Sequence, residues 1–204
     1  MVANYKAIIN DIIKYATEEN IPIMQKEGII YLTDYIVKHD VKNVLEIGTA
    51  IGFSAIMMAI SKEDIHITTI EKDEGRYLEA IKNIKKMELE DKITLIFNDA
   101  LNTSLEDKYD LIFIDAAKSK NTDLFQKYEL NLTNDGTIIT DNMNFHGLVD
   151  KDESEISSRN LRGLVRKVKA YHEFLENNPK YVTEFSDAGD GLAISRKKEF
   201  VENK

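Results

Sequence analysis

Oxygen-bearing side chains directly follow short apolar runs in this sequence, and their types could hold a metal ion. Asp115 follows the run 109–114, and Asp141 and Asn142 follow the run 136–140. Carboxylate and amide oxygens suit a hard divalent cation, Mg²⁺ first and Ca²⁺ or Mn²⁺ as alternatives. An Asp-Asn pair alone is often only a turn. The additional carboxylate of Asp115 is what favours a metal site.

A lysine lies three residues after the first of these carboxylates. Lys118 could act as a general base if neighbouring positive charge lowers its affinity for a proton. Two alternatives are an ordinary surface lysine and a reaction in which the metal alone acidifies the acceptor. His146 follows Asn142 closely and is either a substrate contact or, more commonly, a plain loop residue.

A glycine-containing turn forms a second candidate site. Gly48 and Gly52 follow an apolar run, and small residues there let the backbone approach a ligand closely. Glu71, 23 residues beyond Gly48, is placed to accept hydrogen bonds from ribose hydroxyls, and a solvated glutamate at the end of a strand is the alternative. Ala50 stands where a dinucleotide fingerprint has its middle glycine, and no Walker lysine follows. A buried carboxylate at Glu46 would be costly without a partner, so a functional or hydrogen-bonded role is expected.

The elements that must position these groups alternate between strand and helix. Two amphipathic helices, 4–19 and 25–38, come first. Strands are expected at 43–47, 65–70, 93–97, 109–114 and 136–140. Helices are expected at 53–60, 74–88 and 121–130, with a short helix or loop at 100–107 and an apolar face on 74–88 formed by Leu78, Ile81, Ile84 and Met87. This order predicts a doubly wound, mostly parallel α/β sheet with helices on both faces, whose ligands bind beyond the carboxyl ends of the strands. Asn134-Asp135-Gly136 is interpreted as the turn before the fifth strand.

The last third of the chain departs from this alternation. An acidic loop at 150–155, a helix at 157–176 and an antiparallel pair of strands at 181–185 and 191–196 are expected. Arg159, Arg162, Arg166 and Lys169 are spaced three, four and three residues apart, so they share one helix face. Such a basic stripe, in a chain of net charge −9, is an electrostatic footprint for phosphates. A solvated face and a contact with the acidic loop of a second subunit are the alternatives.

Composition narrows the class of protein. The 204 residues include no cysteine, which excludes disulfides, thiolate metal sites and cysteine nucleophiles. No apolar run approaches the ~20 residues that span a membrane, and no targeting segment is evident. We therefore expect a cytoplasmic protein with no membrane partner.

Three ordered motifs resemble one enzyme family. They are Glu46-Ile47-Gly48-Thr49-Ala50-Ile51-Gly52-Phe53-Ser54, Phe113-Ile114-Asp115-Ala116-Ala117-Lys118, and Asp141-Asn142 with Gly147. Together they resemble the cation-dependent O-methyltransferases of the catechol and caffeoyl-CoA type. The resemblance covers most of the chain. One departure is Ala117, where the plant caffeoyl-CoA enzymes carry a second aspartate, which argues against an acyl-CoA phenol as the acceptor.

The resemblance implies a seven-stranded methyltransferase sheet in a single domain, 1–204. It divides the domain into N-terminal helices (1–40), a cofactor and metal core (41–145) and an acceptor side (146–204). It implies Mg²⁺ at Asp115, Asp141 and Asn142, with Asp115 and Lys118 as catalytic residues, and a homodimer. It implies S-adenosylmethionine at Met24, Glu46, Gly48, Ser54, Glu71, Asp99, Ala100 and Asp115.

The C-terminal third resembles a narrower subgroup, the bacterial tRNA 5-hydroxyuridine methyltransferases. The matching stretches are Arg159-Asn160-Leu161-Arg162, Lys167-Val168-Lys169-Ala170, Asn178-Pro179 and Gly189-Asp190-Gly191-Leu192-Ala193-Ile194-Ser195. This implies methylation of the wobble nucleoside of tRNA to 5-methoxyuridine, with Arg159, Arg162, Arg166 and Lys169 on the RNA. The alternatives are a small catechol-like acceptor and a non-catalytic nucleotide-binding module; the latter has no need for Asp115, Asp141 and Asn142 together.

Overall fold

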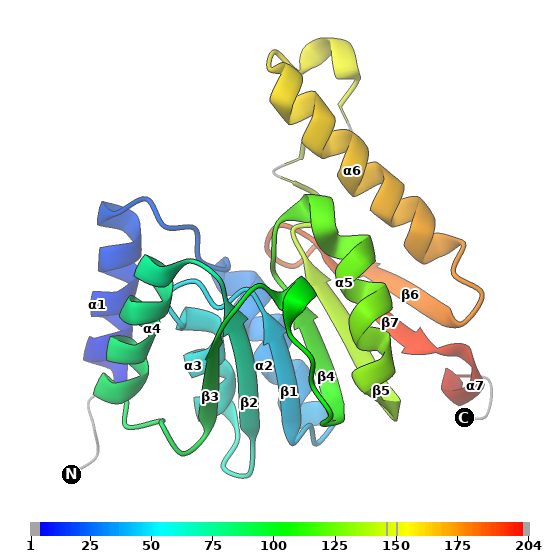
Figure 1. The fold of residues 1–204 in the computed structure, drawn as a ribbon. Helices are drawn as coiled ribbons and strands as arrows, with labels where there is room; N and C mark the ends of the chain where they lie inside the picture. Colours follow the sequence, from blue (N-terminus) through cyan, green and yellow to red (C-terminus); the bar gives the residue numbers. More distant parts are fainter. Residues whose placement is uncertain (1–4, 146, 150, 202–204) are drawn as a thin grey trace. The chain divides into compact units, whose positions relative to one another are not determined.

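The computed structural model describes residues 5–145, 147–149 and 151–201, so the expectation for His146 lies outside the described residues. The chain divides into two compact units, Met1–Ser104 and Leu105–Lys204. Figure 1 shows their elements. No helix in the described part of the chain is both long enough and apolar enough to cross a bilayer.

The first unit alternates helices with three parallel strands. Its helices are α1 (Tyr5–Glu18), α2 (Lys26–Lys38), α3 (Phe53–Ser61) and α4 (Glu74–Lys86), followed by the 3₁₀ turn η1 (Ala100–Asn102). Its strands are β1 (Asn43–Ile47), β2 (His66–Glu71) and β3 (Ile93–Phe97). β2 pairs in parallel with both neighbours, so the carboxyl ends of the three strands share one edge.

The second unit contains the remaining strands and the longest helix. Its strands are β4 (Tyr109–Ile114), β5 (Leu132–Asp141), β6 (Tyr181–Ser186) and β7 (Leu192–Lys197). Its helices and helical turns are η2 (Lys118–Lys120), α5 (Asn121–Tyr128), η3 (Glu129–Asn131), η4 (Glu153–Glu155), α6 (Arg159–Glu176) and α7 (Lys198–Val201). In Figure 1, α5 lies in front of β4 and β5, and the amino-terminal half of α6 extends beyond the ends of these strands.

The strands form a seven-stranded sheet in the order β3-β2-β1-β4-β5-β7-β6. β4 and β5 pair in parallel, whereas β7 is antiparallel to both β5 and β6. The predicted mostly parallel sheet with an antiparallel closing strand is therefore confirmed.

Two local predictions were wrong. Asn134-Asp135-Gly136 is not a turn before β5, because β5 already begins at Leu132. The pairing with β4 shifts register between Tyr109 and Leu111, and this irregularity absorbs the extra residues without ending the strand.

The buried face of α4 also differs in part from the predicted one, although Ile84 and Met87 are buried as predicted. Leu78 and Ile81 are 49% and 40% exposed, whereas Ala80 and Asn83 are buried. Asn83 Nδ2 donates to the carbonyl of Ile51 at 2.9 Å, and Gly52 lies directly against Ala80. A small residue and an amide are therefore needed where α4 meets the glycine turn, and larger apolar side chains would not fit.

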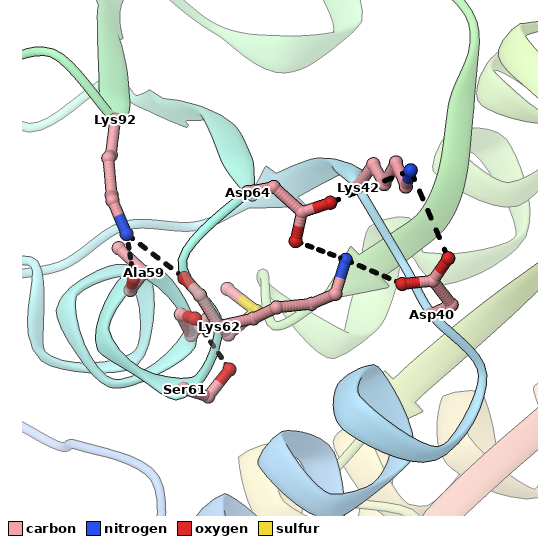
Figure 2. Close-up of polar contacts among 8 residues, drawn as sticks. Asp40, Lys42, Ala59, Ser61, Lys62, Asp64 and Lys92 are labelled. Atoms are coloured by element: carbon pink, nitrogen blue, oxygen red, sulfur yellow. Dashed lines mark hydrogen bonds and ion pairs between the residues drawn. The ribbon is translucent and has the colours of Figure 1, made fainter.

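Charged residues tie together the amino-terminal ends of strands β1 and β2 in the first unit (Figure 2). Lys62 Nζ lies 2.8 Å from Asp40 and 2.6 Å from Asp64, and Lys42 Nζ lies 3.5 Å from Asp64. The hydrogen bond with Asp40, followed by that with Asp64, raises the pKa of Lys62. Lys92 Nζ donates to two carbonyls at the end of α3, those of Ala59 and Lys62. This cluster lies at the edge opposite the glycine turn, so it supports the fold rather than the site.

Candidate functional site

The glycine turn follows β1 and is held by a carboxylate from the next strand. Gly48, Ala50 and Gly52 all have positive φ, of 101°, 47° and 86°. The conformation is strained for Ala50 by roughly 1–2 kcal/mol. Its N–H donates to Glu71 Oε2 at 2.8 Å, which fixes the turn.

Backbone hydrogen bonds hold the carboxylate of Glu71, and its contact with a ribose stays a prediction. It is the last residue of β2, and its carboxylate accepts hydrogen bonds from the backbone N–H groups of Ala50, Lys72 and Asp73 at 2.8–2.9 Å. A carboxylate has about four acceptor positions, so one remains on the oxygen facing the turn. The side chain is therefore rigid and can still accept a hydroxyl donor.

Glu46 has a hydrogen-bonded role, one of the two that the sequence predicted for it. Its buried carboxylate accepts bonds from the hydroxyls of Ser54 and Thr69, both at 2.5 Å. The Oγ1 atom of Thr69 in turn lies 2.5 Å from Oγ1 of Thr49. The hydroxyl of Ser54 is thus engaged by Glu46, and cofactor contacts of both residues stay predictions. The sequence analysis missed Thr69, although a threonine in an apolar strand is the signal for such a partner.

The other predicted cofactor residues of the first unit lie at different depths. Asp99 follows β3, and its carboxylate accepts the N–H of Leu101, which places Ala100 in a 3₁₀ turn. Asn98 N–H donates to the carbonyl of Glu71, so this segment lies next to the end of β2. Met24 is buried against Gly28 of α2. Its contact with a cofactor stays a prediction.

The second unit brings the predicted metal ligands together. Asp115 follows β4, and Asp141 is the last residue of β5; the preceding residues, Ile114 and Thr140, are paired partners. Adjacent strands lie about 4.8 Å apart, so the two carboxylates are neighbours. The Nζ of Lys118 donates a hydrogen bond to Asn142 Oδ1, and Asn142 N–H donates to Asp141 Oδ1 at 2.7 Å. All four predicted residues of this site thus come together within one unit.

The site carries excess negative charge. Burial, followed by repulsion from Asp115, raises the pKa of Asp141 to about 7, against the effects of its bond with Asn142 N–H and the charge of Lys118. Burial also raises the pKa of Asp115, and Lys118 opposes this. Asp190 adds a further negative charge near Asp141; the sequence analysis did not assign it to the site, although its Gly-Asp-Gly context marks a tight turn.

A hard divalent cation fits this donor set. It would relieve the repulsion between Asp115 and Asp141, and the Asn142 oxygen is a suitable neutral ligand. Within 5–145, 147–149 and 151–201 no three His, Cys, Asp or Glu side chains gather as a metal site. A cation here therefore depends on the amide of Asn142.

The four basic residues of α6 are not equivalent. Arg159 and Arg166 are exposed. Arg162 donates to the carbonyls of Ile156 and Ser157, just before the helix begins, so it supports the start of α6. Lys169 is half-buried, and its charge contributes to lowering the pKa of Asp152, after the larger effect of hydrogen bonds from Ser154.

Comparisons with known proteins point to one enzyme family. A family model described as O-methyltransferase matches residues 2–198. A caffeoyl-CoA O-methyltransferase of Populus kitakamiensis is 26% identical over 192 residues, covering 90% of this chain and 81% of the relative.

Solved structures extend the comparison. A Staphylococcus aureus protein provisionally assigned as a caffeoyl-CoA O-methyltransferase superposes with a TM-score of 0.88 at 38% identity, covering 93% of this chain and 91% of that one. An O-methyltransferase of Bacillus cereus, solved in complex with SAH, shares the fold with a TM-score of 0.80 at 22% identity, covering 94% and 91% of the two chains.

Proposed function

The chain belongs to the O-methyltransferase family and is an S-adenosylmethionine-dependent enzyme, and we propose that its methyl acceptor offers two adjacent oxygen atoms to a divalent cation. The observation that carries this proposal is the pair Asp115 and Asp141 beside Asn142, of which Asp141 is buried. A cation would stabilise two neighbouring carboxylates in this site, whereas a nucleotide-binding module without catalysis has no need of such a pair.

Different residues would bind the cofactor and the cation. Glu71 and the turn 48–52 would bind and orient the cofactor, while Asp115, Asp141 and Asn142 would hold the cation. When bound, the cation lowers the pKa of the acceptor hydroxyl and the cofactor supplies the methyl group. Lys118, whose Nζ donates a hydrogen bond to Asn142 Oδ1, would take up the acceptor's proton. Catalysis then consists mainly of positioning and electrostatics.

A small catechol-like phenol is the acceptor that the named relatives favour. A catechol offers two vicinal oxygens, which matches a single cation with open positions. The Populus relative is named for a phenolic acyl-CoA substrate. Ala117 in place of a second aspartate favours a free catechol over an acyl-CoA ester.

The 5-hydroxyuridine of tRNA is the second candidate acceptor. Its 5-hydroxyl lies beside the 4-carbonyl, so it presents the same pair of oxygens to the cation. The exposed side chains of Arg159 and Arg166 on α6 support this candidate, because they can bind phosphates. The predicted cytoplasmic location and homodimer fit either acceptor and stay predictions.

Methyl transfer from labelled S-adenosylmethionine to a catechol and to tRNA carrying 5-hydroxyuridine tests the proposal. We expect Mg²⁺-dependent transfer to one of them, abolished by EDTA. Asp141→Ala should lower the rate at least about 100-fold, because it removes a metal ligand. Asp135→Ala, at the exposed start of the same strand, is the matched control and should keep full activity.

Two results would decide against parts of this proposal. Full activity of Asp141→Ala in EDTA would exclude the metal site. Mass spectrometry of tRNA nucleosides from cells that lack the protein separates the acceptors: accumulated 5-hydroxyuridine would identify tRNA, and an unchanged profile would favour the small phenol.

A further inference from the structure

The chain bends at the predicted metal ligand Asn142. This residue has a φ of 63°, in the left-handed region. The next two N–H groups both donate to one loop: Met143 to the carbonyl of Gly191 at 3.0 Å and Asn144 to the carbonyl of Asp190 at 2.8 Å. In a regular strand, successive N–H groups point to opposite sides. Both reach the same loop because the backbone leaves the extended conformation after Asn142 and bends at Met143, the residue that joins the two peptide planes.

The loop that accepts these bonds is itself a tight turn. Gly191 N–H donates to the carbonyl of Ala188 at 3.1 Å, and Gly189 and Gly191 have φ values of 63° and 83°. A Cβ atom at Gly191 would lie 2.7 Å from Cγ and Oδ1 of Asn144 and 2.8 Å from its backbone nitrogen. No side chain fits there unless the main chain of Asn144 moves.

Helix α6 holds the same segment from another direction. His172 Nε2 lies 3.0 Å from the carbonyl of Met143, and its ring stacks on Phe185 at 4.8 Å with an angle of 8° between the planes. Both backbone polar groups of Met143 are thus fixed. The residue directly after Asn142 has little freedom to shift.

We propose that Gly191 is a positioning residue for the cation. Because Gly191 has no side chain, the segment 143–144 can approach closely enough to bond to the carbonyls of Asp190 and Gly191. These bonds keep Asn142 in its left-handed conformation, with the Oδ1 of Asn142 directed at the site. Asn142 is the uncharged ligand. Its contribution to cation affinity therefore depends more on the exact position of its oxygen than the contributions of Asp115 and Asp141 do. The inference rests on the proposed function, since it requires that a cation binds there.

The probe is Mn²⁺, measured by electron paramagnetic resonance of the free ion, without acceptor or cofactor. We expect Gly191→Ala to weaken Mn²⁺ binding by about 10- to 100-fold, the usual effect of losing a residue that orients a metal ligand. Affinity for S-adenosylhomocysteine should change less than about twofold, because Gly48 and Glu71 are untouched.

Gly147→Ala is the matched control. Gly147 also has a positive φ, of 70°, but no atom of the residues that the structure describes lies within 4 Å of an added Cβ. This variant introduces similar backbone strain without the collision with Asn144. It should therefore keep its Mn²⁺ affinity within about threefold.

The outcomes separate the two proposals. If the wild-type protein does not bind Mn²⁺, the proposed metal-dependent function fails. If it binds and folded Gly191→Ala binds equally well, only the positioning role fails.

If circular dichroism shows that Gly191→Ala does not fold, hydrogen exchange of the wild-type protein decides instead. Coupling between sites is reciprocal, so Mg²⁺ should slow exchange of the Met143 and Asn144 amides several-fold. Unchanged exchange of both amides in a protein that binds Mg²⁺ would overturn the inference.

Discussion

Asp141 combines burial with two acidic neighbours, Asp115 and Asp190, and its pKa of about 7 makes cation binding sensitive to pH. A proton and a cation compete for the carboxylate, and the proton is bound below the pKa. The affinity for Mg²⁺ should therefore fall by up to tenfold for each pH unit below about 7 and level off above it. Calorimetric titrations at pH 6, 7 and 8 measure this. Equal affinities at all three pH values would contradict the assignment.

Glu71 supports a prediction about the cofactor. Glu71→Gln replaces an acceptor oxygen by an NH₂ group that faces backbone N–H donors. Affinity for S-adenosylhomocysteine should fall by about 10- to 100-fold, or about 1.4–2.8 kcal/mol. Calorimetry measures this affinity. The control is Glu74→Gln, which changes an exposed residue three positions later. Similar affinities of the two variants would exclude Glu71 as a ligand.

The chemical types of the site residues could be predicted from the sequence, but their partners could not. Asp115, Asp141 and Glu71 stand at the ends of apolar strands, and the sheet brings such positions to one edge within each unit. Thr69 meets Glu46 only because β1 and β2 pair in that register. Gly191 meets Asn144 through the pairing of β5 with β7. Such contacts between distant segments leave no local pattern.

At the scale of elements, strand cores were predictable and their edges were not. β1, β3 and β4 have the predicted bounds because each is a short apolar run. The start of β5 was missed because a register shift lets Asn134 and Asp135 remain in the strand. For α4, the burial of Ile84 was predicted, but that of Ala80 was missed because tight packing against Gly52, rather than apolar character, decides it.

Helix α3 follows the glycine turn, and Lys92 stabilises its far end. The Lys92 ammonium satisfies two carbonyls there and opposes the negative end of the helix dipole. Lys92→Met should lower the free energy of unfolding by about 1 kcal/mol. Lys14→Met, which removes only an exposed pair with Glu18, should change it by less than about 0.5 kcal/mol. Urea unfolding measures the free energy of unfolding of both variants. Equal free energies would exclude a stabilising role for Lys92.

At the scale of the whole molecule, the net charge of −9 repels RNA, so any tRNA binding must rely on a local basic surface. The double variant Arg159→Glu/Arg166→Glu tests that surface and spares Arg162, which supports the start of α6. If tRNA is the acceptor, KM for tRNA should rise about tenfold at low salt and depend less on salt concentration.

The matched control for this variant is Lys85→Glu/Lys86→Glu, at the exposed end of α4. It reverses the same number of charges on the first unit, so it changes the net charge equally. A rise in KM common to both double variants would indicate general repulsion and not a binding surface. Methylation of a catechol should be unaffected by either, because a small neutral acceptor has no phosphates to bind. Unchanged tRNA kinetics in the α6 variant at several salt concentrations would remove the support for tRNA and leave the small phenol.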